Sequence, residues 1–107
     1  MIKVLIYQKP NGKEPFVDWL ESLPWYDQVK IRKRISRLEI GNFGDHKSID
    51  DGVFELRFFF GSGYRVYFGL DNKTLVILLT GGNKSSQVRD IKKAKEYWME
   101  AKNEIVS

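Results

Sequence analysis

Apolar residues follow two periods along the chain, and the change of period marks the predicted elements. Residues 2–7 (IKVLIY) form a short, β-branched run that is typical of a strand. Between Phe16 and Leu23 the apolar positions recur at i, i+3, i+4 and i+7, which predicts one face of a helix that begins near Pro15 and ends at Pro24. A strand followed by a short helix is therefore expected.

A second helix is expected over residues 26–40, with Gly41 at its end. One of its faces carries an apolar stripe, and another carries four cations at i, i+3, i+4 and i+7. These four cations, called the basic ridge below, are Lys30, Lys33, Arg34 and Arg37. The ridge is either a solvated helix face or a surface that follows an RNA backbone or contacts an acidic partner.

Three apolar runs lie close together further along the chain, at residues 53–60, 64–70 and 74–80. The first two alternate between apolar and polar positions, as half-buried strands do. The third is continuously apolar, which predicts a strand covered on both faces. Polar residues 42–52 are expected to form the loop that precedes the first of these strands.

The hairpin between the first two runs determines which side chains share a face. A tight loop over residues 61–63 (GSG) pairs Phe60 with Tyr64. With that register, Arg57 and Arg65 lie on one sheet face as diagonal neighbours.

A final helix is expected after residues 81–83 (GGN), which end the third apolar run flexibly. Ser85 or Ser86 can cap this helix. Its apolar stripe consists of Val88, Ile91, Ala94, Trp98, Ala101 and Ile105.

The resulting order is β-α-α-β-β-β-α in a single domain over residues 1–107, since a chain of 107 residues has no room for a second core. This order predicts a small α+β fold with a mostly antiparallel sheet and with the helices packed on one face.

The composition restricts the classes of function. A net charge of +4 favours a polyanionic partner, such as nucleic acid, a membrane surface or an acidic protein. The lack of cysteine excludes disulfides and thiol nucleophiles, and with a single histidine it argues against a structural zinc site. We expect no metal and no cofactor. The first residues show no signal-peptide pattern, and no apolar run approaches the ~20 residues that a membrane helix needs. We therefore expect a cytoplasmic location without a membrane segment.

Four cations accompany the predicted sheet and the start of the last helix, and none has an evident pairing acid. They are Arg57, Arg65, Lys84 and Arg89. Two arginines on one sheet face are more easily tolerated when an anion lies between them, and a helix N-terminus also favours phosphate. The four cations can therefore converge on one phosphodiester. The alternative is that Glu55, Asp90 or other acids pair with them.

Cleavage of RNA needs a base for the 2′-hydroxyl, stabilisation of the charged phosphorane and an acid for the leaving 5′-oxygen. Arginine suits the second task through its bidentate fork, and a lysine among cations can act as base or acid. Tyr64 and Tyr67 offer rings for stacking unpaired bases, or hydroxyls for proton donation. Asp90 can join proton transfer, although stabilisation of a helix N-terminus explains it equally well. His46, in the central loop, is a weaker candidate proton carrier.

Three segments resemble the RelE/HigB-like toxins of bacterial type II toxin–antitoxin modules, most closely the phage-derived Gp49-like (HigB) branch. The segments are DGV-x-ELR at residues 51–57, G-x-GYRVYF at residues 61–68 and LL-x-GG-x-KSSQ-x-RDI-x-x-AK at residues 78–95. The resemblance implies a RelE-like fold and a ribosome-dependent mRNA endonuclease, or mRNA interferase, that inhibits translation. It also implies contacts with mRNA and rRNA on the ribosome, and a cognate HigA-like helix-turn-helix antitoxin that neutralises the toxin.

The resemblance also implies roles for individual residues. Arg65 matches the arginine of the family's GYR strand, which is assigned to phosphate or transition-state stabilisation. Arg57 matches the ELR motif, and Lys84 falls where related toxins have a basic residue after the last strand. The branch's own terminal motif covers Gln87, Arg89 and Asp90. Gln87, Lys47, the two tyrosines and the basic ridge are the expected RNA contacts.

The sequence also departs from RelE itself. Where RelE has lysines on the strand before its LR pair, this chain has Val53 and Glu55, and Asp90 aligns with a RelE tyrosine. The general base is therefore open between Lys84, Lys47 and Asp90. The missing lysines also motivate a second hypothesis, a catalytically weak binding module that acts only in a repressor complex with its antitoxin. A DNA-binding protein is a weaker reading, because these cations lie on a sheet and at a helix start.

Overall fold

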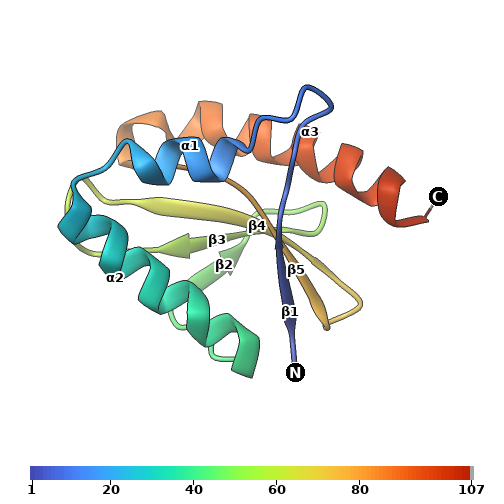
Figure 1. Cartoon of the computed structure of the whole chain (residues 1–107), viewed down its shortest axis with the longest axis horizontal. Helices are drawn as coiled ribbons and strands as arrows, with labels where there is room; N and C mark the ends of the chain where they lie inside the picture. Colours follow the sequence, from blue (N-terminus) through green and yellow to red (C-terminus); the bar gives the residue numbers. More distant parts are fainter. Residues whose placement is uncertain (107) are drawn as a thin grey trace.

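The computed structural model describes residues 1–106, which form a five-stranded sheet between two helical layers (Figure 1). The strands are β1 (Lys3–Ile6), β2 (His46–Ser48), β3 (Val53–Arg57), β4 (Arg65–Asp71) and β5 (Leu75–Gly82). The helices are α1 (Pro15–Glu21), α2 (Trp25–Ser36) and α3 (Gln87–Val106), with 3-10 turns η1 (Arg37–Ile40) and η2 (Lys84–Ser86).

The strands are ordered β1-β5-β4-β3-β2. Only β1 and β5 pair in parallel among the described strands, so the predicted α+β fold with a mostly antiparallel sheet is confirmed. The element order was incomplete, because β2 lies inside the segment expected to be a loop. This strand has three exposed polar residues at the sheet edge, so it carries no apolar alternation that a sequence pattern could detect.

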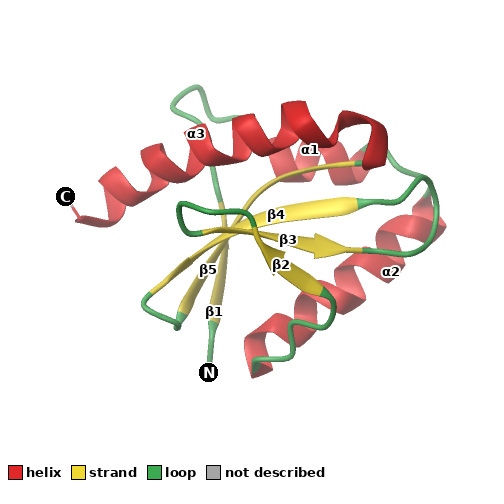
Figure 2. Ribbon diagram, turned by 180° about the vertical axis from the view of Figure 1, so that it is seen from behind, coloured by secondary structure: helices red, strands yellow, loops and turns green. Residues whose placement is uncertain are grey.

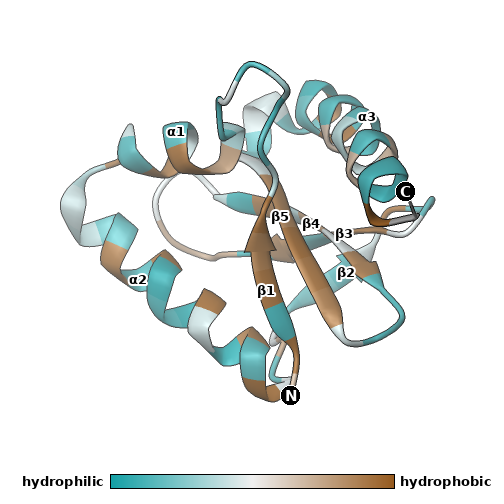
Figure 3. Cartoon of the chain, turned by 45° about the vertical axis from the view of Figure 1, so that its right-hand side comes forward, coloured by the Kyte–Doolittle hydropathy of each residue, from teal (hydrophilic) through white to brown (hydrophobic). Residues whose placement is uncertain are grey.

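The helices cover both faces of the sheet, so the expectation that they share one face is wrong (Figures 2 and 3). Successive residues of β5 point to opposite faces: Val76 and Leu78 pack with α1 and α2, whereas Ile77 and Leu79 pack with α3. This arrangement explains why β5 is apolar without interruption. Below, the two sides are called the α1/α2 face and the α3 face.

The β3–β4 hairpin has a different register from the expected one. Arg57 lies directly opposite Arg65, and the Phe58 amide donates to the Tyr64 carbonyl at 3.0 Å. The loop is therefore wider than three residues, and the two arginines are direct cross-strand neighbours instead of diagonal ones. Because directly opposed side chains are closer than diagonal ones, their mutual repulsion is stronger than the expected register implied.

The junction between β5 and α3 is packed closely. Gly81 and Gly82 belong to β5 and do not form a flexible end, since a Cβ on Gly81 would lie 2.2 Å from the Trp19 ring. Asn83 caps the turn that follows by accepting hydrogen bonds from the amides of Ser85 and Ser86. Asn83 thus takes the role expected of the serines, and it fixes where α3 begins.

The two predicted N-terminal helices are present, and the second one tightens into η1 before Gly41, whose φ is 81°. In α3 the predicted stripe is correct at its centre, where Ala94, Trp98 and Ala101 are buried, but Val88 is 87% exposed. No helix within residues 1–106 is long and apolar enough to cross a membrane.

Candidate functional site

Charged side chains gather on the part of the α3 face formed by β2, β3 and β4. Lys47 lies opposite Glu55, Glu55 lies opposite Tyr67, and Arg57 lies opposite Arg65. Other residues of the same strands, Val53 of β3 and Tyr67 of β4, pack with α3 together with residues of β5. We call the group of Lys47, Glu55, Arg57, Arg65 and Lys84 the charged site.

Glu55 is the central group of the charged site. Its side chain is 1% exposed, and its Oε1 lies 3.6 Å from the Arg65 Nε. Its Oε2 accepts a hydrogen bond of 2.9 Å from the Gln87 Nε2. Gln87 therefore bonds to a protein side chain in this structure, and Arg65 has the pairing acid that the sequence did not make evident.

Arg65 is held in one orientation by backbone and acid together. Its Nη1 donates to the Gly63 carbonyl at 3.0 Å, and its side chain is 13% exposed. No hydrogen bond of its Nε or Nη2 is present within residues 1–106. The ion pair with Glu55 and the hydrogen bonds of Nη1 to the backbone therefore hold the guanidinium in place.

Arg57 is more open than Arg65. Its Nε lies 3.6 Å from an Asp45 carboxylate oxygen, and its side chain is 37% exposed. The expectation that Arg57 and Arg65 lack acidic partners is therefore wrong, and the alternative in which acids pair with the cations is correct for these two. Asp45 precedes β2, and no sequence pattern predicted its contact with Arg57.

Lys84 lies beside Arg65. A Cβ placed on Gly63 would be 3.4 Å from the Lys84 Cβ and 3.7 Å from the Arg65 Nη1, so both side chains border the same glycine. The Lys84 side chain is exposed and has no ion pair within residues 1–106. The position of Gly63 at φ 76° brings the β3–β4 loop against the start of η2.

Asp90 is buried behind these groups. It accepts a hydrogen bond from the Ser86 hydroxyl, and its Oδ1 lies 3.8 Å from the Arg89 Nε. Arg89 itself is 71% exposed. The contacts of Asp90 are those of a residue that stabilises the first turn of α3, which is the structural alternative considered from the sequence.

Neither tyrosine presents a ring to solvent, so the expected base stacking has no support. Tyr64 is buried on the α1/α2 face, where its hydroxyl donates to Asp27 at 2.7 Å, and this hydrogen bond raises its pKa. Tyr67 is fully buried on the α3 face. Burial, followed by the negative charge of Glu55, raises the pKa of Tyr67, which keeps the hydroxyl protonated.

His46 and Lys47 lie on β2 and therefore point to opposite faces. The His46 ring lies 5.3 Å from Phe43 and 6.3 Å from Phe54, and its Nδ1 lies 2.9 Å from the Gly44 carbonyl. Both phenylalanines pack on the α1/α2 face, so His46 is away from the charged site. Lys47 is exposed and lies on the side of Glu55.

The basic ridge lies on α2 and on the first residue of η1, and it is separate from the charged site. Lys30, Lys33 and Arg37 are exposed. Arg34 turns inward, and its guanidinium donates to the backbone carbonyls of Arg57, Phe43 and Asp45. Arg34 therefore ties the central segment to the end of β3 and is not a solvated member of the ridge.

The charged site combines cations with two acids. Two neighbouring arginines each have a carboxylate partner, Asp45 for Arg57 and Glu55 for Arg65, and the exposed Lys84 and the start of α3 lie alongside. Within residues 1–106 there is no group of three or more acidic, histidine or cysteine side chains that could hold a metal ion. These side chains are of the types that can stabilise charge and transfer protons.

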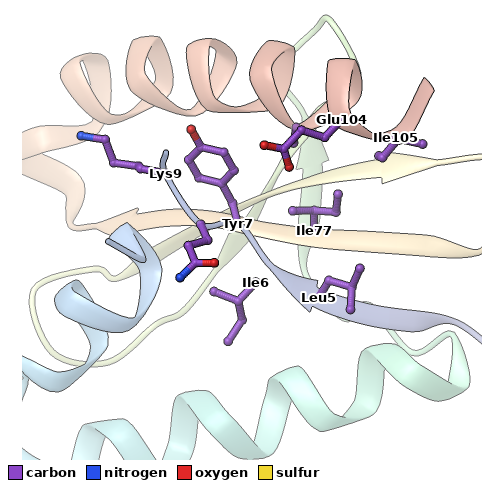
Figure 4. Close-up of a pocket in the computed structure, with 9 residues that line it drawn as sticks. Leu5, Ile6, Tyr7, Lys9, Ile77, Glu104 and Ile105 are labelled. Carbon is purple, nitrogen blue, oxygen red and sulfur yellow. The ribbon is translucent and has the colours of Figure 1, made fainter. Parts of the chain in front are cut away.

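A second concave region lies beside β1 and has a different character. This groove of about 390 Å³ runs between the strand and the end of α3, and Leu5, Ile77 and Ile105 line it (Figure 4). At its margin the Tyr7 hydroxyl donates to Glu100, and burial together with this contact raises the pKa of Tyr7. None of the cations of the charged site borders the groove.

Comparison with known proteins gives two findings. Residues 18–101 match the model of a family described as "Phage derived protein Gp49-like". The chain is also 56% identical over 81 residues to a Haemophilus influenzae protein described as uncharacterized, covering 75% of this chain and 82% of that protein. The family match begins inside α1 and includes α2, all residues of the charged site and most of α3.

Proposed function

Because the chain belongs to the Gp49-like family, which is a family of RelE/HigB-like toxins, we propose that it is the toxin of a toxin–antitoxin module and that it cuts mRNA on the ribosome. Cleavage would inhibit translation. The proposed partners are mRNA and rRNA on the ribosome and a cognate HigA-like helix-turn-helix antitoxin, and the proposed location is the cytoplasm.

The observation that best supports the proposed cleavage is that Arg57 lies directly opposite Arg65 on the neighbouring strand, beside the exposed Lys84. Two guanidinium groups in neighbouring positions repel each other, and Glu55 and Asp45 offset their two charges. The exposed Lys84 adds a further positive charge that would attract a phosphodiester, whose own negative charge increases in the phosphorane transition state.

The roles follow from how each group is held. Arg65, fixed through Nε and Nη1, suits stabilisation of the phosphorane. Lys84, which is exposed and next to Arg65, is the preferred candidate for proton transfer. The buried Glu55 carboxylate positions Arg65 through an ion pair and Gln87 through a hydrogen bond. Lys47 remains a second candidate for the base, while the buried and hydrogen-bonded Asp90 is the least accessible of the three.

Primer extension on an mRNA in a purified bacterial translation system tests this proposal, with and without ribosomes. Arg65→Ala should lower cleavage by about 10²–10³-fold if Arg65 acts as a preorganised charge donor. Arg65→Lys retains the charge beside Glu55 and should remain folded, yet it lacks the fork and should also lose most activity. Lys84→Ala should lose activity, whereas Lys92→Ala, on the outer side of α3, serves as the control.

Wild-type activity in Arg65→Ala and Arg65→Lys, at matched amounts of folded protein, would refute the role of Arg65.

A second candidate function is the catalytically weak module that acts only in an antitoxin complex. The specific observation in its favour is that acids already pair with Arg57 and Arg65. A folded wild-type chain that produces no cuts on ribosomes and no growth arrest when expressed would support this second function.

A further inference from the structure

A groove with cations and aromatic rings lies at the opposite side of the β3–β4 loop from the charged site. It has a volume of about 260 Å³ and lies between α2 and the segment that follows β3. Its lining consists of the four cations of the basic ridge and of Phe58, Phe59 and Phe60, and it includes no acid.

The cations of this groove lie close together, and Arg34 is compensated by hydrogen bonds to three backbone carbonyls. None of the four forms an ion pair within residues 1–106. Burial and the neighbouring Arg37 lower the pKa of Arg34, while Asp45 raises it. Like charges at helical spacings of three and four residues destabilise a helix, so a bound anion would relieve a repulsion already present in the free protein.

The aromatic rings of the groove fall into two groups. Phe58 packs 4.7 Å from the Arg34 guanidinium, and Phe60 lies 4.8 Å from the Lys30 ammonium, so both rings already have cationic partners. Phe59 is 87% exposed. A large apolar side chain held in water beside unpaired cations has the features of a stacking surface for a base whose phosphates bind nearby.

We propose that this groove binds one unpaired nucleotide of a single-stranded RNA, with the base stacked on Phe59 and the flanking phosphates bound by Lys33 and Arg37. The volume is below the ~300–1,000 Å³ of sites for drug-sized ligands, which suits one nucleotide better than a folded element. An acidic peptide would satisfy the cations but would leave the exposed ring unexplained.

The groove and the charged site are connected through the backbone. Arg34, which lines the groove, donates to the carbonyl of Arg57. An RNA strand bound in the groove would have to pass around the β3–β4 loop to reach the charged site, because the two regions lie on opposite sides of that loop. The inference rests on the proposed function in taking RNA as the ligand, but it concerns binding alone and does not require cleavage.

Binding is measured by fluorescence anisotropy with a labelled single-stranded RNA whose 2′-hydroxyls are methylated, so that it cannot be cut. Phe59→Ala should weaken binding about ten-fold without changing its dependence on salt. The double variant Lys33→Ala/Arg37→Ala should lower the slope of log K against log salt by about 1.4, because two phosphate contacts are lost. Val88→Ala, at an equally exposed apolar position, and Lys92→Ala/Lys93→Ala are the matched controls.

A second arm separates the two sources of the RNA. Co-sedimentation with vacant ribosomes reports binding to rRNA, whereas the labelled oligonucleotide stands for the message. Weaker binding by the groove variants, to the oligonucleotide or to the ribosomes, supports the proposal and shows whether the bound RNA is mRNA or rRNA. Unchanged binding in both arms, or no binding by the wild type, overturns it. Loss of binding to a purified antitoxin alone also overturns it and makes the groove a protein interface.

The outcomes for binding and for cleavage are separable. A wild-type chain that never cuts, but whose binding depends on Phe59 and the ridge, refutes the nuclease and leaves the groove intact. A chain that cuts with wild-type efficiency after Phe59→Ala and Lys33→Ala/Arg37→Ala, with unchanged RNA binding, refutes the groove and leaves the nuclease intact.

Discussion

At the scale of single residues, the buried charge of Glu55 explains most of the charged site. It is 1% exposed, and without partners a carboxylate at such a position would be strongly disfavoured. Arg65 and Gln87 both contact it, so each of these side chains has a structural reason for its orientation as well as a proposed functional one. The same buried charge makes Arg65→Lys a better test than Arg65→Ala, because removal of the whole side chain leaves Glu55 without its ion pair.

The Tyr67 hydroxyl gives a prediction for alkaline pH. It is buried next to Glu55, and burial, followed by the negative charge of Glu55, raises its pKa above the ordinary value of 10.0. Above pH ~10 the unfolded chain loses this proton while the folded chain keeps it, so the unfolded state binds fewer protons and stability falls as pH rises. Tyr67→Phe should therefore show a smaller loss of unfolding free energy between pH 8 and 11 than the wild type.

Urea unfolding at a series of pH values measures this difference. Tyr26→Phe, at a position that is 71% exposed, is the control and should follow the wild type. An identical alkaline loss in Tyr67→Phe and wild type would show that this hydroxyl does not contribute.

At the scale of elements, the sequence predicted those whose periodicity is strong. The helices and the strands β3 and β4 carry clear periods of 3.6 or 2, β5 is a continuous apolar run, and alternation correctly placed Arg57 and Arg65 on one face. β2 was missed because three exposed polar residues have no such period. The continuous apolar run of β5 shows that both of its faces are buried, but it does not show which helix covers each face, and α3 was therefore misplaced.

The residues of the charged site were predictable only in part, because a sequence pattern describes one element and not the contacts between elements. Side chains two residues apart on one strand point to the same face, so the sequence could place Glu55 with Arg57. The predicted hairpin added Arg65 to that face. Asp45 and Gln87 come from other segments, and their contacts depend on the tertiary packing. Tyr64 was misjudged because its ring has a polar hydroxyl that can also be satisfied inside a core, here by Asp27.

The junction of β5 and α3 leads to a prediction at this scale. A Cβ on Gly82 would lie 1.8 Å from the Asp90 Oδ2, so Gly82→Ala must displace the first turn of α3 and Lys84 with it. We expect a loss of stability of about 1–3 kcal/mol and reduced cleavage per folded molecule. Thermal unfolding and primer extension measure the two effects.

Gly41→Ala is the matched comparison for Gly82→Ala. Gly41 has φ 81° but no atom within 4 Å of an added Cβ, so the substitution costs about 1–2 kcal/mol through backbone strain alone. It should lower stability without lowering cleavage per folded molecule. Equal activity losses in the two variants would mean that the position of α3 does not control the charged site.

At the scale of the whole molecule, the β3–β4 hairpin lies between two cationic regions with different properties. In the charged site, buried and backbone contacts fix Arg65, which suits a task that requires geometry. In the groove, Lys33 and Arg37 are exposed and Phe59 lies in solvent, which suits attraction and stacking. The two regions should therefore contribute to different steps of a reaction on RNA.

This division predicts a separation of kinetic effects in the ribosome-dependent cleavage assay. Phe59→Ala should raise the ribosome concentration needed for half-maximal cleavage by about ten-fold and leave the maximal rate unchanged, because stacking far from the reacting phosphate stabilises the bound and transition states equally. Arg65→Lys should lower the maximal rate with little change in that concentration, since the lost fork acts on charge that develops in the transition state. A fall in the maximal rate after Phe59→Ala, with the half-maximal concentration unchanged, would contradict this division and place the aromatic tip of the hairpin in the chemical step.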